Sequence, residues 1–419
     1  MFRVTRLKGA FVESKKYLAP DSGLPPFSRR GFLRGATALT AAAGAVPARA
    51  ASGDVIAYIG AYTDRGRGIH MFYVNPSDGT LTPWKILTGL PNPSSLAFHP
   101  SKKFLYAVNE ISNFSGTANG SVTAIAVEGG TGDLRIMNVV NSRGGGPAHL
   151  SVDPSGKWVF AANYGTGTAA VLPIMADGSL GDAADVVTLS GPLGRQPAVD
   201  APPGSFAVSG HDRPHAHMAE TDPAGNFLYV ADLGTDRIYI YKFDKVNGKL
   251  SPNDQPFLQA SPGAGPRHFE FHPNGRWAYA ITEEASTFLF LAWDSAKGTL
   301  EIKQSAFCVP EKYAGTNYPS EILISSDGRF LYGANRLHDS IAVFAINPDG
   351  WMIRAGDVWT QGSYPRHFAV EPNGNFMYVL HSRSDNVTSF RVDRTTGMLT
   401  FTGQWVPVGN PSKIVFLTL

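Results

Sequence analysis

The chain has one cysteine, Cys308, in 419 residues. A single cysteine excludes an internal disulfide, so the fold must be stabilised by its apolar core whatever the redox state of its compartment. No motif beside Cys308 suggests a nucleophile, and we expect this thiol to have a buried, structural role. The G-x-S-x-G elbow of many serine hydrolases is also missing, so the sequence does not support a serine nucleophile.

Lysine and arginine form no tract outside the N-terminal region. The chain carries 36 Lys and Arg against 34 Asp and Glu, but residues 1–50 hold nine of the former and two of the latter. The remaining 27 basic and 32 acidic residues give the rest of the chain a net charge of −5. A mildly acidic chain without a basic patch is a poor nucleic-acid binder, so we expect no nucleic-acid partner.

The first fifty residues have the pattern of an export leader. Residues 28–34, SRRGFLR, precede the short apolar run 36–46 and the motif A-R-A at 48–50. This order predicts a signal peptide over 1–50, and the paired arginines indicate twin-arginine export, which carries folded proteins. The apolar run is too short to span a bilayer. We therefore expect a periplasmic or secreted protein with no integral membrane span after cleavage; a leader kept as an anchor is the alternative.

A long phrase recurs seven times in the rest of the chain. It consists of Pro, two residues, an apolar residue, a Pro or Asp-Gly turn and a strand that ends in an aromatic pair. The copies begin at Pro93, Pro147, Pro214, Pro266, Pro319, Pro365 and, truncated, Pro411. Their spacing of about 50 residues is typical of a propeller or a solenoid. In the copy from Pro266, the segments PRHFEF, RWAYAITE, STFLFLAW and GTLEIKQSAF predict the four strands of one propeller blade.

The two ends of the repeat region complete each other. Residues 54–90 supply three strand-like segments without a first strand, whereas 411–419 supply a first strand without the other three. Pairing them would close a ring and remove exposed sheet edges. We therefore predict an all-β fold, a seven-bladed β-propeller over 51–419 whose N-terminal strands pair with the C-terminal strand; an open stack of repeats is the alternative. The Pro- and Gly-rich stretch 190–210 predicts a long loop over one face.

The repeat also predicts which side chains meet. The first strand of each blade should line the central channel, and the residue two after the repeat Pro forms a column. Its members are Ser95, His149, His268, Glu321, His367 and Lys413, and one inserted residue in the third copy brings His217 into it. The next strand returns antiparallel to the same mouth. Its ends, four residues after the repeat aromatic, are Glu110, Tyr164, Leu233, Glu283, Arg336 and Ser382.

Together with Arg267 and Arg366, these columns predict a charged cluster at one mouth of the channel. Arg and Glu are seldom buried without a partner or a substrate. The residue types suit hydrolysis of a cyclic ester on an anionic sugar, in which a base deprotonates water and donors stabilise the oxyanion. Glu283 and His217 are the candidate bases. Arg267 and Arg336 are candidates to hold the anion or the oxyanion.

At these residues the chain resembles the seven-bladed propeller lactonases, which include bacterial 6-phosphogluconolactonase and the fungal carboxy-muconate lactonizing enzyme. The resemblance covers about 54–419 and is carried by DLGTDRI from Asp232, GPRHFEFHPNG from Gly265, Glu283 and NRLHDSIAVF from Asn335. It implies lactonase activity with four catalytic residues. By position these are His217, Arg267, Glu283 and Arg336. The best-known substrate of the family belongs to the cytoplasm, whereas this chain has an export pattern, so the need for a phosphate group stays open.

Other interpretations remain at this stage. His149, His268, Arg366, His367 and Glu110 are candidates for substrate contact, with packing between blades as the alternative. His99 and His272 lie in repeated F-H-P turns and are expected to be structural. The spacing of His215 and His217 also allows a divalent metal, although we expect no cofactor. We expect a monomeric lactonase that acts on a small-molecule sugar lactone. The alternatives are a carboxy-cis,cis-muconate-type cycloisomerase, a metal-dependent esterase and a non-enzymatic extracytoplasmic binding module.

Overall fold

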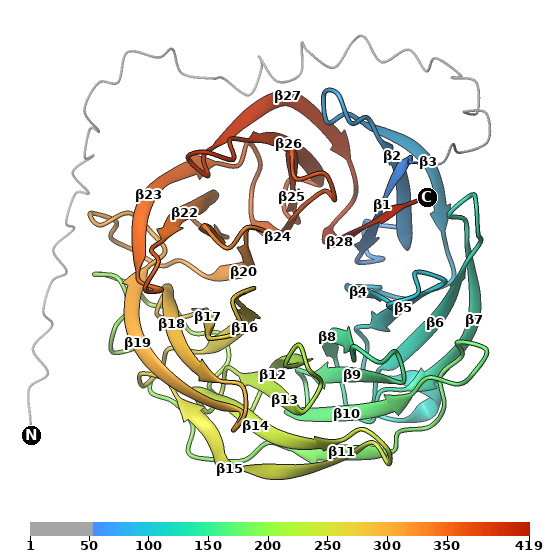
Figure 1. The fold of residues 1–419 in the computed structure, drawn as a ribbon, viewed down its shortest axis with the longest axis horizontal. Coiled ribbons are helices and arrows are strands. Elements are labelled where there is room, and N and C mark those ends of the chain that lie inside the picture. The colour runs from blue at the N-terminus through green and yellow to red at the C-terminus, as the bar shows by residue number, and fades with distance from the viewer. Residues whose placement is uncertain (1–52) are drawn as a thin grey trace, which may run out of the picture. The chain divides into compact units, whose positions relative to one another are not determined.

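Seven four-stranded antiparallel sheets are arranged in a ring in this protein, a seven-bladed propeller (Figure 1). The computed structural model describes residues 53–419, so the predicted leader over 1–50 lies outside the described residues. We number the sheets as blades 1–7 in chain order, starting with the sheet that contains β4. No helix within 53–419 is long and apolar enough to cross a membrane.

The bounds of the elements follow the repeat. Blade 1 has β4 (Ser95–Phe98), β5 (Phe104–Asn109), η1 (Phe114–Gly116), β6 (Ser121–Val127) and β7 (Leu134–Asn141). Blade 2 has β8 (Pro147–Val152), β9 (Trp158–Asn163), β10 (Thr168–Pro173) and β11 (Asp185–Thr188). Blade 3 has β12 (Ala216–Thr221), β13 (Phe227–Asp232), β14 (Arg237–Asp244) and β15 (Lys249–Gln259). Blade 4 has β16 (Pro266–Phe271), β17 (Trp277–Thr282), β18 (Thr287–Asp294) and β19 (Thr299–Phe307).

The last three blades keep the same order. Blade 5 has β20 (Pro319–Ile324), β21 (Phe330–Asn335), β22 (Ser340–Ile346) and β23 (Met352–Trp359). Blade 6 has β24 (Pro365–Val370), β25 (Phe376–His381), β26 (Asn386–Val392) and β27 (Leu399–Pro407). Blade 7 joins β28 (Pro411–Thr418) to β1 (Val55–Ala61), β2 (Ile69–Val74) and β3 (Leu81–Leu87).

The predicted closure of the ring is confirmed. β28 pairs antiparallel with β1 along its whole length, from Val55 opposite Thr418 to Ala61 opposite Pro411. In Figure 1 the red C-terminal strand lies beside the blue N-terminal strands. Because the first and last blades are one sheet, the ring has no open edge at the seam.

The repeated aromatic residue of the second strand connects each blade to the next. Tyr279 donates a hydrogen bond to the carbonyl of Gly350 in the following blade at 2.7 Å, and Tyr378 does the same to Gly79 across the closure at 2.9 Å. Equivalent bonds are made by Tyr58, Tyr106, Tyr229 and Tyr332. Phe160 has no hydroxyl, and in its blade Trp158 Nε1 donates to Lys245 O at 3.0 Å instead. Apolar clusters fill the space between neighbouring sheets, so the core runs around the ring rather than through its centre.

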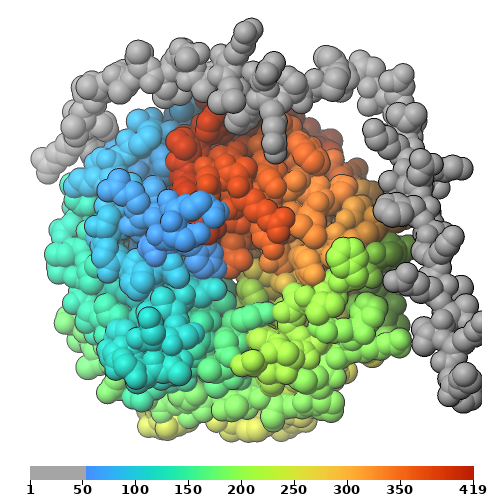
Figure 2. Space-filling view, turned by 180° about the vertical axis from the view of Figure 1, so that it is seen from behind, coloured from blue at the N-terminus to red at the C-terminus, as the bar shows by residue number. Residues whose placement is uncertain are grey.

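The stretch 190–210, which we call the strap, contains no strand and lies between β11 and β12, as predicted. It crosses to the loop that precedes blade 5, where Gly315 N donates to Pro203 O and Phe206 N donates to Thr316 Oγ1. Figure 2 shows lime-coloured residues of this part of the chain beside the orange of blade 5. The strap therefore links blades that are not adjacent in sequence.

Candidate active site

A β-bulge at the start of the first strand aims two consecutive side chains into the channel. In β16 the pairing shifts between Pro266 and His268, so Arg267 is the bulged residue. In a regular strand, neighbouring side chains point to opposite faces, whereas a bulge re-aims one of them. Arg267 and His268 consequently both line the same cavity.

The bulge also corrects the predicted register of His217. Ala216 pairs with Asp232 as Pro266 pairs with Thr282, and the shift in β12 lies between Ala216 and Met218. His217 is therefore the equivalent of Arg267, and Met218 takes the place in the histidine column. The prediction that one inserted residue places His217 in that column was wrong, because β12 starts two residues after Pro214.

A small pocket that is open to solvent lies in the throat of the channel. It brings together six of the predicted site residues, namely His149, His217, Arg267, His268, Arg366 and His367. Glu321 and Lys413, predicted for the histidine column, also line it. With Ser95 from blade 1, the cavity contains first-strand residues from all seven blades, as the repeat predicted.

Glu283 holds two arginines at the mouth on one carboxylate oxygen. Its Oε2 lies 3.0 Å from Arg267 Nε and 2.6 Å from Arg336 Nη2. The three side chains are only 3–8% exposed. Burial and the like charge of Arg336 lower the pKa of Arg267 to about 10, so the guanidinium of Arg267 remains charged at neutral pH.

Four imidazoles and one carboxylate form the wall beside this cluster. His217 Nδ1 lies 3.1 Å from His268 Nε2, and His268 Nδ1 lies 2.9 Å from Glu321 Oε1. The other carboxylate oxygen of Glu321 lies 3.1 Å from His367 Nε2. Burial, and then the charge of Arg267, hold the pKa values of His217 and His268 well below the ordinary value, so both rings are neutral. The His149 ring packs edge-on against His268 at 5.5 Å.

A second charged cluster lies on blades 6, 7 and 1. Arg366 Nη2 donates to the hydroxyl of Tyr62 at 2.5 Å, and this hydroxyl donates to Glu110 Oε2 at 2.6 Å. Arg366 Nε donates to Ser412 Oγ at 3.1 Å. The structure therefore brings Arg366 and Glu110 together, and Glu283 also acts electrostatically on Arg366.

Tyr62 was missed in the sequence. It lies four residues after Tyr58, the repeat aromatic of blade 7, and so completes the column that contains Glu110 and Glu283. Blade 7 has no full copy of the phrase because its first strand comes from the other end of the chain. Aligning the blades on the aromatic residue instead of the proline would have found it.

The motifs that carry the family resemblance contain site residues and also the residues that position them. Asp236, in DLGTDRI, accepts hydrogen bonds from the amides of Gly265 at 2.9 Å and Gly263 at 2.6 Å, and so fixes the turn before Arg267. Asn335 donates to Cys308 O at 2.7 Å and accepts from Asn317 Nδ2 at 2.8 Å at the turn that presents Arg336. Cys308 itself is buried, as expected.

Histidines outside the mouth have structural partners. His99 Nε2 lies 3.0 Å from Gly156 O, and His272 Nε2 lies 2.8 Å from Gly328 O, each in the next blade. Both ring nitrogens of His215 are engaged, Nδ1 by Tyr164 O at 2.9 Å and Nε2 by Asp212 Oδ1 at 2.7 Å. In the part of the chain that the structure describes, no three His, Cys, Asp or Glu side chains are arranged to hold a metal ion. The pair His215 and His217 therefore does not fit a metal site in this arrangement.

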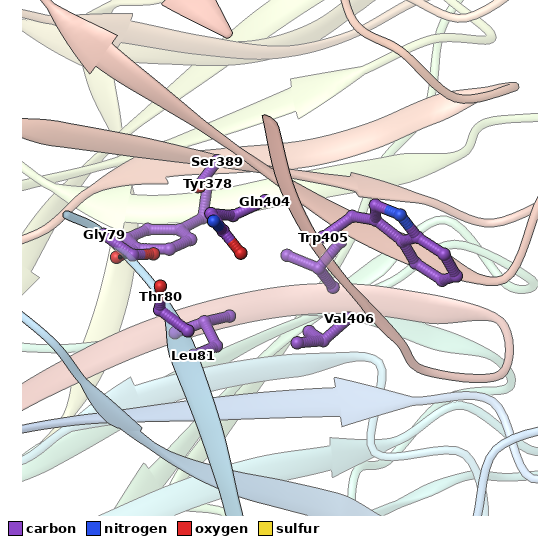
Figure 3. A pocket seen from close by; sticks show the side chains of 9 residues that line it. Gly79, Thr80, Leu81, Tyr378, Ser389, Gln404, Trp405 and Val406 are labelled. Atoms are coloured by element: carbon purple, nitrogen blue, oxygen red, sulfur yellow. Dashed lines mark hydrogen bonds between the residues drawn. The ribbon is translucent and has the colours of Figure 1, made fainter. Parts of the chain in front are cut away.

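A further cavity of about 200 Å³ lies between blades 6 and 7 (Figure 3). Tyr378, Leu81 and Val406 line it, and the indole of Trp405 points away from the other lining side chains. It contains no carboxylate, imidazole or guanidinium, so it lacks the groups that ester hydrolysis needs.

Comparisons with known proteins agree with this arrangement. Residues 56–416 match the family described as lactonase, 7-bladed beta-propeller. A curated relative from Bacillus subtilis, named 6-phosphogluconolactonase, is 32% identical over 366 residues, which cover 86% of this chain and 98% of the relative. The solved structure of a periplasmic gluconolactonase from Pseudomonas aeruginosa has a TM-score of 0.78 at 29% identity and covers 87% of this chain and 99% of that one. A putative 6-phosphogluconolactonase from Bacteroides fragilis has a TM-score of 0.77 at 28% identity, with 87% and 98% covered. The chain belongs to the family of seven-bladed β-propeller lactonases.

Proposed function

We propose that this protein hydrolyses a gluconolactone-type sugar lactone outside the cytoplasm. The single observation that carries the proposal is the neutral His217 in the same throat as Arg267, which Glu283 holds beside Arg336 through one carboxylate oxygen. The names of the relatives, 6-phosphogluconolactonase and periplasmic gluconolactonase, support the same substrate class. The export pattern in residues 1–50 supports the compartment.

The geometry suggests a metal-free water attack. His217 accepts a proton from water, and the resulting hydroxide oxygen bonds to the lactone carbonyl carbon. The guanidiniums of Arg267 and Arg336 stabilise the charge that develops on the carbonyl oxygen, a contribution of about 10²- to 10³-fold for one such donor. The bond from the carbonyl carbon to the ring oxygen then breaks, and the ring oxygen takes the proton from His217. Glu283 keeps the two arginines in place through Oε2.

The second cluster suits the hydroxyl groups of an unphosphorylated sugar. Glu110 lies 3.9 Å from Arg366, so the two charges offset each other, and the hydroxyl of Tyr62 bridges them. Such a cluster offers both donors and acceptors to neutral hydroxyls, whereas the Glu110 carboxylate would repel a phosphate. His149 and His367 complete the wall that would contact the sugar.

The test uses protein expressed from the full chain and recovered from the extracytoplasmic fraction, with its N-terminus read by mass spectrometry. Hydrolysis of freshly made gluconolactone and 6-phosphogluconolactone is followed with and without a chelator. We expect turnover above the spontaneous rate, a higher kcat/KM for gluconolactone and no effect of the chelator. His217→Asn should lower kcat by about 10²- to 10⁴-fold.

Glu283→Gln should lower kcat by about 10²-fold or more, because the arginines lose their shared anion. His99→Gln is the matched control, since His99 lies in a turn outside the throat and bonds only to its neighbours. Failure of the purified protein to hydrolyse either lactone above background would refute the proposal. Loss of activity with the chelator would replace it with a metal-dependent lactonase.

A further inference from the structure

We propose that Glu321 and His268 form a relay that fixes the proton on His217 and makes its Nε2 the base of the reaction. The inference deepens the proposed function and rests on it for the reaction, but its first test does not need turnover. Neither residue has to touch the substrate for this role, so both are positioning residues.

The tautomer of His268 follows from its neighbours. Arg267 Nη1 lies 3.4 Å from His268 Nε2, and a guanidinium can only donate hydrogen bonds. Nε2 of His268 is therefore an acceptor and carries no proton. A neutral imidazole has one N–H, so the proton of His268 lies on Nδ1, which donates to Glu321 Oε1 at 2.9 Å.

The tautomer of His217 then follows from that of His268. Because His268 Nε2 has no proton, the 3.1 Å contact with His217 must be a hydrogen bond donated by His217 Nδ1. The single proton of the neutral His217 is thus on Nδ1, and its Nε2 has a free lone pair. Within residues 53–419 no hydrogen bond engages this Nε2, and His217 lines the throat cavity.

The charges around the ring explain why a relay is useful. An imidazolium at His217 would lie close to three guanidiniums, because Arg267, Arg336 and Arg366 all depress its pKa. After His217 Nε2 has taken a proton from water, its Nδ1 proton can pass to His268 Nε2, and the Nδ1 proton of His268 can pass to Glu321. Both imidazoles are then neutral, and Glu321 is a neutral carboxylic acid. Each step moves one proton along an existing hydrogen bond, and the reverse steps return the proton to the leaving ring oxygen.

Several groups keep Glu321 ionised before the reaction begins, so that it accepts the hydrogen bond from His268. Burial opposes its charge, but Lys413, His367 and Arg267 outweigh burial and lower its pKa. Lys413 Nζ lies 3.9 Å from Oε2, and the amide of Ile322 donates to Oε1 at 3.2 Å. Other titratable groups that act on the relay are His149, Arg336, Arg366 and the two buried carboxyls Glu220 and Glu270.

The first test reads the tautomers directly. In ¹⁵N NMR of the uniformly labelled protein, we expect His217 and His268 to be Nδ1–H tautomers, whereas free histidine favours Nε2–H. The result stands whether or not a lactone is hydrolysed, so it separates failure of this inference from failure of the proposed function. A proton on Nε2 of His217 would overturn the relay even in a fully active lactonase.

The second test follows turnover of gluconolactone. Glu321→Gln should lower kcat by about 10- to 100-fold with KM changed by less than about threefold, because its amide cannot accept the relayed proton. The proton inventory in H₂O–D₂O mixtures should change from curved to linear. Glu301→Gln is the matched control, a carboxyl-to-amide change on the outer strand β19, where Glu301 pairs with Lys303, and should leave kcat within about twofold. If Glu321→Gln leaves both the proton inventory and kcat unchanged, the relay is contradicted. It is also contradicted if the fall in kcat is fully explained by a loss of folded protein, measured as a lower melting temperature.

Discussion

At the scale of single residues, the two charged clusters have different proposed roles, one at the reacting carbonyl and one in binding the sugar. Glu283 organises two arginines around the reacting carbonyl, and Arg366 with Glu110 offers a charge-balanced surface through Tyr62. A residue that contacts the sugar equally in the ground and transition states affects KM more than kcat. Tyr62 is the residue that separates these two roles most cleanly.

Tyr62→Phe removes one hydroxyl and little volume. We expect KM for gluconolactone to rise by about tenfold, with kcat changed by less than about threefold, since the hydroxyl bridges Arg366 and Glu110 but does not contact Glu283. Steady-state kinetics checks this. Tyr73→Phe, in β2 and partly buried beside Trp84, is the control. A large fall in kcat would instead place Tyr62 among the groups that act on the carbonyl.

The site residues were predictable as far as the repeat is regular. The spacing of identical phrases placed Arg267, Glu283 and Arg336 at one mouth, and their contacts bear this out. A backbone bulge cannot be seen in such spacing, because it changes the direction of a side chain without changing the composition. His217 was placed one column too far along its strand for a separate reason, namely that β12 starts two residues after Pro214 instead of at the repeat Pro.

At the scale of elements, the strap is held by an ion cluster beneath it. The His211 side chain has no exposed area and lies between Asp236, at 2.9 Å from Nε2, and Glu284, at 3.1 Å from Nδ1. Glu284 Oε1 also accepts the amides of Ser209 at 2.6 Å and Gly210 at 3.0 Å. The same Asp236 fixes the turn before Arg267, so the strap and the site share one anchor.

The anchor should weaken as pH rises. Burial opposes the charge of His211, but Asp236 and Glu284 raise its pKa to about 9. Since this pKa is above the unfolded value of about 6.5, the stabilisation is complete below pH 6.5 and is lost as pH rises through 9. We expect hydrogen-exchange protection factors of the Ser209 and Gly210 amides to fall over this window, and His211→Gln to abolish the pH dependence. Protection that stays constant from pH 6 to 9 would contradict this account.

At position 194 the strap also depends on glycine. A Cβ there would lie 2.0 Å from Asp236 Oδ2 and 2.4 Å from His211 Cδ2. This close approach explains how a long loop without strands keeps a defined position. The sequence indicated a loop over 190–210 from its Pro and Gly content, but its anchors come from blades 3 and 4 and carry no local pattern.

At the scale of the whole molecule, the ring is closed by pairing and by repeated hydrogen bonds between blades. The closure and the blade count were predictable because each blade repeats the same phrase and the two chain ends supply complementary parts. The tyrosine bonds to the next blade were not, since the sequence shows only that the aromatic residue recurs. A ring of this kind buries the ionisable side chains at its centre. Their burial shifts their pKa values, so the free energy of unfolding depends on pH.

Stability should therefore pass through a maximum near pH 6.5. Burial and then Lys413 lower the pKa of His149 to about 3, and His217 and His268 are lowered too, so the folded state binds fewer protons than the unfolded state below pH 6.5. Stability then falls on acidification, by up to about 1.4 kcal/mol per pH unit for each such ring. Above pH 6.5 the sign reverses, because His211 has a raised pKa.

Urea unfolding midpoints from pH 4.5 to 9 measure the fall in stability on both sides of pH 6.5, which we call the acid limb and the alkaline limb. His149→Gln should flatten the acid limb and leave the alkaline limb unchanged, whereas His211→Gln should do the opposite. Burial raises the pKa of Glu220 from 4.5 to about 7 and that of Glu270 to about 8, so these groups lower the stability as pH rises through this range and partly offset the histidines below pH 6.5. A pH dependence of the midpoint that is unchanged in both His149→Gln and His217→Asn would show that the channel histidines take up protons in the folded state. It would also remove the basis for a neutral His217 acting as the base.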